Sequence, residues 1–131
     1  MSAGQRQRIS SGGPWEATAG YSRAIVVGDS CWVAGTTDAG PDGRSQHPGD
    51  VRAQARAAFA IIERALGEGG FTLDDVVRTR MFVTAIGSAT AVSAAHAEVF
   101  GLTRPAATLV AVAALLDPSL LVEIEAEARR R

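Results

Sequence analysis

A strictly alternating stretch near the C-terminus constrains the fold of this chain more than any other feature. Across residues 122–128, apolar side chains occupy every second position and glutamates occupy the positions between them. A period of two is typical of a strand with one dry face and one polar face. Carboxylates in a row repel one another unless cations lie nearby, and Arg78 and Arg80 alternate in the same way on another predicted strand. We therefore expect the functional site near this charged face.

Size and composition indicate one globular domain, which we expect to span residues 1–131. The chain is 47 % hydrophobic and 21 % charged, too apolar for a disordered segment. Its net charge of −1 predicts neither a nucleic-acid partner nor a membrane partner. With one cysteine and a polar N-terminus, a cytoplasmic location is expected, and Cys31 is interpreted as a small core residue. Trp15 and Tyr21 are interpreted as aromatic cover for an edge of the core.

The spacing of apolar residues predicts the order of strands and helices. Helices separate several strands, so the sheet must contain crossovers. We predict an α/β (α+β) fold in which two helices pack on one face of a mixed sheet. The other face keeps apolar residues without a helix to cover them, and a partner subunit is the simplest cover. The predicted strands are 6–10, 22–27, 31–36, 76–84 and a closing pair, 104–112 with 121–128, and the predicted helices are 51–66 and 89–100. Asp50 is the predicted N-cap of the first helix, and the rest of residues 1–20 is predicted to be a loop.

Few residues carry recognisable chemistry. His47 and His96 lack a spaced second ligand, and no phosphate loop or nucleophile elbow occurs, so we expect no metal and no cofactor. The remaining candidate is Glu123, because a carboxylate on a partly buried strand face can relay a proton to or from water when its pKa is tuned. The alternative is a solvated glutamate or one in an ion pair with Arg78 or Arg80.

Several short motifs are individually common but specific as an ordered set. They are Gly20-Tyr21-Ser22-Arg23-Ala24, Trp32-Val33-Ala34-Gly35-Thr36-Thr37, Pro48-Gly49-Asp50-Val51, Ala53-Gln54-Ala55-Arg56, Val76-Val77-Arg78-Thr79, Arg104-Pro105-Ala106-Ala107-Thr108 and Val122-Glu123-Ile124-Glu125-Ala126. Over roughly residues 15–128 the chain resembles the YjgF/Rid family. The resemblance implies a chorismate-mutase-like fold and a homotrimer with clefts between its subunits. It also implies hydrolysis of the reactive enamines and imines made by pyridoxal-phosphate enzymes, giving 2-oxo acids and ammonia without a cofactor or metal.

Site residues follow from the same resemblance. Tyr21 matches a tyrosine near the cleft, and Gly35 matches a glycine whose backbone approaches the ligand. Glu123 matches the carboxylate that places the attacking water. This chemistry is reasonable, because an imine carbon is already electrophilic and water then needs only orientation and a proton acceptor.

The chain departs from the family pattern at the substrate-binding arginine of the deaminase branch. That position is Ala107 here, and the position of a family cysteine is Leu109, so the resemblance is to a branch without the deaminase arginine. An alanine cannot hold a carboxylate. Arg104 is a candidate replacement, although a three-residue offset along a strand places it on the opposite face, and Arg78 and Arg80 are others. The cleft is therefore expected to take a carbonyl or imine compound, or a neutral or differently charged small molecule.

Two functions stay open from the sequence. One is a homotrimeric enamine or imine hydrolase (a deaminase) that uses Glu123 as a proton relay. The other is a non-catalytic ligand-binding or chaperone-like trimer. Ribonuclease activity is a weaker third alternative, because a net charge of −1 supplies no basic channel for RNA.

Overall fold

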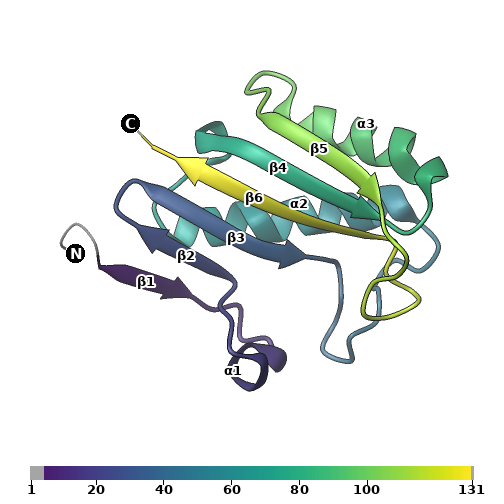
Figure 1. Cartoon of the computed structure of the whole chain (residues 1–131), viewed down its shortest axis with the longest axis horizontal. Helices are drawn as coiled ribbons and strands as arrows, with labels where there is room; N and C mark the ends of the chain where they lie inside the picture. Colours follow the sequence, from purple (N-terminus) through teal and green to yellow (C-terminus); the bar gives the residue numbers. More distant parts are fainter. Residues whose placement is uncertain (1–4, 131) are drawn as a thin grey trace.

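The computed structural model describes residues 5–130 and contains one mixed sheet of six strands (Figure 1). The strands are β1 (Arg6–Ile9), β2 (Ala24–Val27), β3 (Ser30–Thr36), β4 (Val76–Val83), β5 (Ala106–Ala111) and β6 (Val122–Arg129). Their order across the sheet is β1-β2-β3-β6-β4-β5. Only β4 and β5 run parallel, and every other neighbouring pair is antiparallel. The predicted mixed sheet is thereby confirmed.

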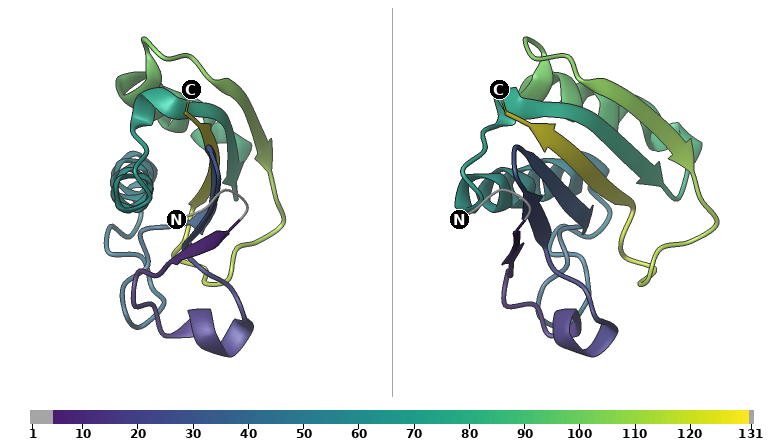
Figure 2. Two further views of the ribbon diagram at one scale, coloured as in Figure 1. Left: turned by 90° about the vertical axis from the view of Figure 1, so that its left-hand side faces the viewer. Right: turned by 60° about the vertical axis from the view of Figure 1, so that its left-hand side comes forward.

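Two helices, α2 (Val51–Glu68) and α3 (Ala89–Phe100), lie on the same side of this sheet, as the side views in Figure 2 show. The predicted cap is present, because the Asp50 carboxylate accepts a hydrogen bond from the backbone N–H of Ala53 at 3.0 Å. Apolar side chains at helical spacing, including Phe59, Ile62 and Leu66 of α2, are buried against the sheet. The opposite sheet face carries no helix, and we call it the open face.

The alternation predicted for β6 is present, and it places this strand in the middle of the sheet. Its apolar residues from Val122 to Ala128 are buried under the helices, while its glutamates lie on the open face between them. The predicted pairing of the last two strands is wrong. The crossover through α3 brings β5 beside β4 in parallel, and the loop 112–121 then carries the chain back so that β6 inserts between β3 and β4. Turn residues such as Asp117-Pro118 reverse the chain without specifying which strand is its neighbour.

A short helix, α1 (Trp15–Ala19), forms in a segment predicted to be a loop. It ends at Gly20, whose φ of 78° lies in the left-handed region that glycine adopts freely. The backbone N–H groups of Gly20 and Tyr21 both donate to the carbonyl of Glu16 at 2.9 Å. This turn fixes Trp15 and Tyr21 beside the end of the sheet, half-exposed rather than covering the core.

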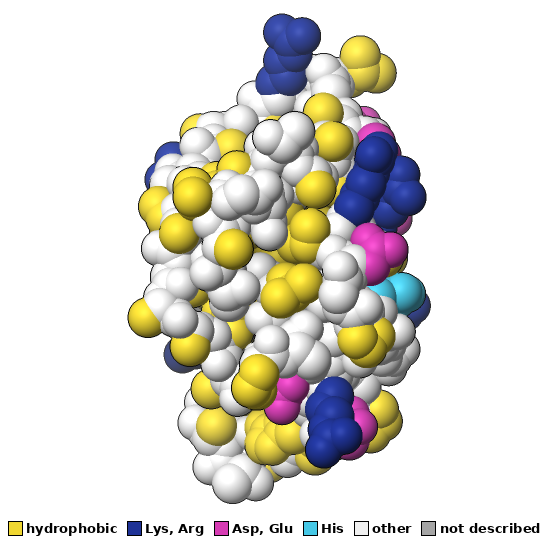
Figure 3. Space-filling view, turned by 90° about the vertical axis from the view of Figure 1, so that its right-hand side faces the viewer, with side chains coloured by type: hydrophobic (Ala, Val, Ile, Leu, Met, Phe, Trp, Pro, Cys, Tyr) yellow, Lys and Arg dark blue, Asp and Glu magenta, His cyan; other side chains and the backbone are white. Residues whose placement is uncertain are grey.

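Apolar side chains are also exposed away from the core. Trp32 on the open face and Val110 on the edge strand β5 are 46 % and 41 % exposed. At the end of the molecule where β4 and β5 finish, hydrophobic side chains are scattered over the surface, and charged ones gather along one border (Figure 3). None of the helices in residues 5–130 is long and apolar enough to cross a membrane.

Candidate functional site

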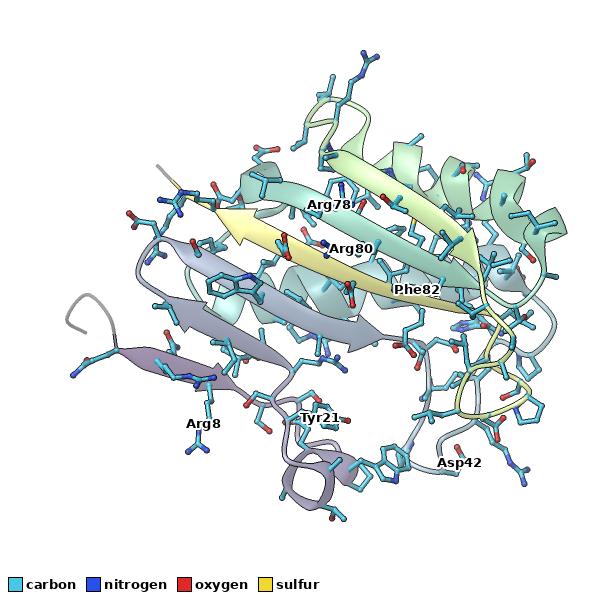
Figure 4. The ribbon with its side chains drawn as sticks, viewed as in Figure 1. Arg8, Tyr21, Asp42, Arg78, Arg80 and Phe82 are labelled. Atoms are coloured by element: carbon cyan, nitrogen blue, oxygen red, sulfur yellow. The ribbon has the colours of Figure 1, made fainter. Side chains whose placement is uncertain are left out.

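A pocket of about 630 Å³ opens at the end of the sheet where β6 begins. The ends of β3 and β6 form its floor, and α1, the loops around 11–14, 37–46 and 116–120, and one turn of α2 form its walls. Tyr21 and Asp42, labelled in Figure 4, reach it from the segment after α1 and from the loop after β3. The pocket brings together Tyr21, Gly35 and Glu123 from three of the motifs described above.

Gly35 has no side chain, and this leaves the space that the Glu123 carboxylate occupies. The residue lies at an irregularity of the β3–β6 pairing between Val33 and Thr36, as expected of a strand glycine. A Cβ on Gly35 would lie 3.0 Å from the carboxyl carbon of Glu123 and closer still to one of its oxygens. The carboxylate therefore occupies the space that any other residue at position 35 would fill.

Arg23 supplies a cation at the same point. Its Nη2 donates a hydrogen bond to the carbonyl of Gly35, and its buried Nε has no hydrogen-bond partner among residues 5–130. Burial lowers the pKa of the Arg23 guanidinium, an effect opposed by Tyr21, Glu16 and Glu123. Arg23 belongs to the first of the sequence motifs given above, but the sequence predicts no role for it. The signal was an arginine entering a strand, 22–27, that is otherwise apolar on both faces.

The electrostatics of Glu123 differ from those of an ordinary surface glutamate. Burial raises the pKa of its carboxyl group, the Arg23 charge partly opposes this, and the Glu125 charge adds to it. Glu123 forms no ion pair with any other residue in the described range 5–130. An unpaired, half-buried carboxylate with a raised pKa is suited to accepting and returning a proton.

The other two glutamates of β6 have cations. Arg80 lies 3.3 Å from Glu125 and 3.4 Å from Glu127. Figure 4 shows Arg78, Arg80 and Phe82 following one another along β4 on the open face. Arg78 donates to the hydroxyl of Thr108 at 3.0 Å, and its Nε is buried without a partner. An ion pair with an arginine of β4, the alternative considered above for Glu123, is therefore formed by Glu125 and Glu127 instead.

Comparison with known proteins assigns the family. The model of the family described as Endoribonuclease L-PSP matches residues 13–130. A crystal structure from Mycobacterium tuberculosis, described as a member of the highly conserved YjgF family, is 47 % identical with a TM-score of 0.87 and covers 96 % of this chain and 100 % of its own. The chain belongs to the YjgF/Rid family.

Two further relatives agree with this assignment. A protein of Streptomyces coelicolor is 38 % identical over 124 residues, which is 95 % of this chain and 92 % of the relative. A crystal structure from Yersinia pestis, described as belonging to the conserved Rid protein family, is 30 % identical with a TM-score of 0.84 and covers 96 % of this chain and all of its own.

Three residues that the YjgF/Rid resemblance brought forward do not lie near Glu123 within one chain. Arg104 is exposed, has a φ of 50° and donates from Nε to the Gly101 carbonyl at 3.2 Å. It precedes β5, at the end of the sheet opposite to Glu123. Ala107 and Leu109 lie on the helix side of β5, where Leu109 packs against the core.

A hydrogen-bonded scaffold holds the loops that wall the pocket. One carboxylate oxygen of the buried Asp38 accepts hydrogen bonds from the Ser45 hydroxyl at 2.8 Å and from the His47 backbone at 3.0 Å, and lies 3.0 Å from His47 Nδ1. The Gln54 side chain donates to the Ser119 carbonyl at 3.0 Å from within α2. These bonds tie the loops 37–47 and 117–121 to α2, so the pocket wall is preformed.

Neither histidine is part of a metal cluster in residues 5–130, where no three His, Cys, Asp or Glu side chains gather in a way that could hold a metal ion. His96 packs against Phe59 and Phe100, and its Nε2 lies 2.8 Å from the Thr79 hydroxyl. Cys31 is buried in the core as predicted, and burial raises the pKa of its thiol to about 11. The side chains of His96 and Cys31 therefore contribute to packing.

Proposed function

We propose that this protein is a homotrimer that binds a small carbonyl or imine compound in the Glu123 pocket and hydrolyses it, with Glu123 as the proton relay. The observation that carries the proposal is the unpaired, half-buried carboxylate of Glu123 in a pocket beside Gly35. Membership of the YjgF/Rid family supports the reaction class.

Glu123 has two tasks in this reaction. As a water oxygen forms a bond to the imine carbon, the carboxylate takes a proton from that water while the C=N electron pair moves to nitrogen. The carboxyl group then returns this proton to nitrogen, which gives a carbinolamine. In a second transfer the carboxylate takes the hydroxyl proton of the carbinolamine and passes it to nitrogen as the C–N bond breaks and the C=O bond forms, so that ammonia and a carbonyl product leave. A raised pKa makes both transfers easier near neutral pH, because the carboxyl group holds the proton more readily than a solvated glutamate.

Trimer formation is supported by surfaces that one chain leaves uncovered. Trp32 and Val110 are large exposed apolar residues, and the buried Nε of Arg78 has no hydrogen-bond partner in the part of the chain that the structure describes. In a trimer with clefts between subunits, the edge strand β5 would lie beside the pocket of a neighbouring subunit. That arrangement would account for the distance of Ala107 and Leu109 from Glu123 within one chain.

The test is ammonia release from freshly generated 2-imino acids, measured above the rate in buffer. Glu123→Gln keeps the size of the side chain and removes the proton acceptor, so kcat/KM is expected to fall by about 10²–10⁴-fold. Glu127→Gln is the matched control, because it is the same change on the same strand face, and we expect it to stay within about threefold of wild type.

Equal rates for wild type, Glu123→Gln and buffer would contradict the hydrolase and leave the non-catalytic binding protein as the function. Ligand binding that survives Glu123→Gln in the absence of any turnover would identify that second function directly. Size-exclusion chromatography with light scattering tests the assembly, and a monomer would contradict the trimer.

A further inference from the structure

We propose that the outer pocket, formed by Pro14, Trp15, Pro41 and Leu116, is a subsite for an apolar substituent of the ligand, and that Trp15 selects this substituent. The ligand is then a carbonyl or imine compound with an aromatic or branched aliphatic group, which lies against Trp15 while the electrophilic carbon lies beside Glu123. The inference rests on the proposed function of the pocket and adds the class of substituent that the pocket accepts.

The size of the pocket is the first observation. Its volume of about 630 Å³ falls within the range of about 300–1,000 Å³ that is typical of sites for drug-sized ligands. A compound of only a few carbon atoms beside Glu123 would leave most of this space to water. A ligand with a larger substituent would displace that water, and apolar walls make the displacement favourable.

The outer pocket lies away from the reacting end. Figure 4 shows Asp42 beyond the end of the sheet, whereas Phe82, which is opposite Glu123 in register, lies within the sheet. Trp15 lies against Gly43, the residue after Asp42, and therefore belongs to the end beyond the sheet. A ligand that reaches both ends has its reacting carbon and its substituent in different surroundings.

The Trp15 ring is held in position while part of it stays accessible. A Cβ on Gly43 would lie 3.3 Å from the ring, and the φ of Gly43 is 82°, a conformation that glycine adopts freely. The N–H of Gly43 donates to the Gly40 carbonyl at 2.9 Å, and the Glu16 carboxylate accepts a hydrogen bond from the Ser11 hydroxyl at 2.6 Å. These bonds order the loop and α1 on either side of the ring. A fixed aromatic ring with accessible surface is preorganised to bind another apolar group.

Leu116 supplies a second apolar surface at the same opening. The backbone N–H of Ser45 donates to the Ser119 hydroxyl at 2.8 Å, which joins the loop beside Trp15 to the loop that carries Leu116. The Leu116 side chain is fully exposed, and it lines the pocket together with Trp15. Water is unfavourable next to two such side chains, and an apolar substituent that binds against them removes it.

The charged groups near the outer pocket do not favour a charged substituent. The Asp42 carboxylate accepts a hydrogen bond from the backbone N–H of Arg44 at 3.0 Å, and the Asp117 carboxylate accepts one from the Ser119 hydroxyl at 2.6 Å. The Ser119 hydrogen bonds and then the charge of Arg44 lower the pKa of Asp117. An ion pair with these solvated groups would gain little, whereas an apolar substituent gains buried area against Trp15.

The experiment compares two neutral ketones on the full-length protein. Benzylacetone is butanone with a phenyl group on its terminal carbon, so the two probes differ only in the substituent. Binding is followed by proton–nitrogen NMR of the indole N–H groups. Trp15 and Trp32 are 45 % and 46 % exposed, and Trp32 on the open face is the internal reference. We expect benzylacetone to bind at least about tenfold more tightly than butanone and to shift the Trp15 signal, with the Trp32 signal unchanged.

Variants at the opening test the role of Trp15. Trp15→Ala should reduce the preference for benzylacetone to about threefold or less, and Trp15→Phe should keep most of it. Leu116→Ser changes a fully exposed side chain and keeps the test decisive if Trp15→Ala folds poorly, and we expect it to reduce the preference by about two- to fivefold. Ile86→Ala is the control, because Ile86 is an exposed apolar residue in the turn after β4 rather than in the pocket, and it should leave the preference unchanged.

Several results would overturn the inference. They are the absence of a preference in wild type, a shift of the Trp32 signal in place of the Trp15 signal, and an unchanged preference in folded Trp15→Ala or, where that variant does not fold, in Leu116→Ser. Dissociation of the assembly in Trp15→Ala, measured by size-exclusion chromatography with light scattering, would also overturn it. That result would show that a neighbouring subunit, rather than a ligand, covers the ring.

The failure of the subsite and the failure of the hydrolase are distinguishable. Glu123→Gln should retain the preference for benzylacetone, because the proton relay takes no part in binding the phenyl group. Turnover that needs Glu123 but has the same KM for the imines of butanone and benzylacetone would refute the subsite alone. A preference for benzylacetone that needs Trp15, with no turnover in any variant, would refute the hydrolase alone.

Discussion

The two halves of β6 carry the same residue on the same face and have opposite environments. At the end of the strand near the pocket, Glu123 is half-buried beside Gly35 without an ion pair. Further along, Glu125 and Glu127 share Arg80. The register explains the difference, because Glu125 and Glu127 lie opposite arginines of β4, whereas Glu123 lies opposite Phe82. One aromatic residue in place of a third arginine leaves this carboxylate without a cation across the strand.

The comparison shows how the carboxylate that we propose as the proton relay differs from two carboxylates that form ion pairs. All three glutamates satisfy the same alternating pattern, and each is two residues from the next. What distinguishes Glu123 comes from the neighbouring strands, where β3 supplies a glycine and β4 supplies an apolar ring. Desolvation without a paired cation raises a carboxyl pKa. Of the three β6 glutamates, Glu123 alone is half-buried without an ion pair to another residue in 5–130.

The largest effect is expected from filling the space beside Glu123. In Gly35→Ala the new methyl group would collide with the carboxylate, so the Glu123 side chain has to move. We expect a loss of about 1–3 kcal/mol in the free energy of unfolding, together with loss of ligand binding. Gly67→Ala in α2 is the control, because its Cβ meets no atom within 4 Å and the helix should gain about 0.5–1 kcal/mol. Chemical denaturation measures both, and equal effects would contradict the close contact at Gly35.

A smaller effect is expected in the other half of the strand. Arg80→Met removes the cation that Glu125 and Glu127 share and leaves two like charges side by side. Because all three side chains are partly exposed, we expect a cost of about 1–2 kcal/mol, between the values for surface and buried pairs. Adding Glu127→Gln should recover part of it in a double-mutant cycle. In the proposed reaction the rate per folded subunit should stay near wild type, and a large fall would show that the two halves of β6 are functionally coupled.

The smallest expected effect is the change in stability of Glu123→Gln with pH, and its sign depends on the direction of the Glu123 pKa shift. A pKa raised by folding favours the folded state below the unfolded value and loses that contribution as pH rises through the folded value. Glu123→Gln should therefore be slightly more stable than wild type at pH 7, by a few degrees in Tm or less, and equal to it well below pH 4.5.

Glu98 provides the control of opposite sign. Hydrogen bonds from Arg56 and Arg52 lower the pKa of its exposed carboxyl to about 2. Glu98→Gln should therefore be less stable than wild type at pH 7, and the difference should disappear only as pH falls through about 2. Thermal melts across this range check both variants, and a loss of stability in Glu123→Gln at pH 7 would contradict the environment assigned to Glu123.

Local sequence patterns predict most of the strands and helices, but they do not predict which strands pair with each other. The alternation of 122–128, the Asp50 cap and the helix 89–100 are all present where the sequence predicts them. The closing strand pair is not formed, because β6 gains more by burying its apolar face between β3 and β4 than by pairing with the exposed edge strand β5. The five-residue helix α1 is too short to show a helical period in the sequence. Only the flanking residues, Gly13-Pro14 before it and Gly20 after it, indicate a change in chain direction there.

The candidate site was predictable in part for a related reason. Glu123, Tyr21 and Gly35 stand in motifs that the sequence displays, and the pocket brings them together. Arg23 could not be singled out, because its role depends on the Gly35 carbonyl across the β2–β3 pair and on the loops that close the pocket. Arg104 was a candidate replacement for the substrate-binding arginine only because it is close to Ala107 in sequence. The strand order places Arg104 far from Glu123 within one chain.

The most direct test of the central claim is a carbon-13 NMR titration of the glutamate carboxyl groups, with Glu98 as the internal reference. We expect the pKa of Glu123 to lie above 4.5 and that of Glu98 to be about 2. Phe82→Arg, which places a cation opposite Glu123, should lower the pKa of Glu123. A Glu123 carboxyl that titrates at or below 4.5 in wild type, or whose pKa does not change in Phe82→Arg, would show that Glu123 does not have the desolvated, unpaired environment described above.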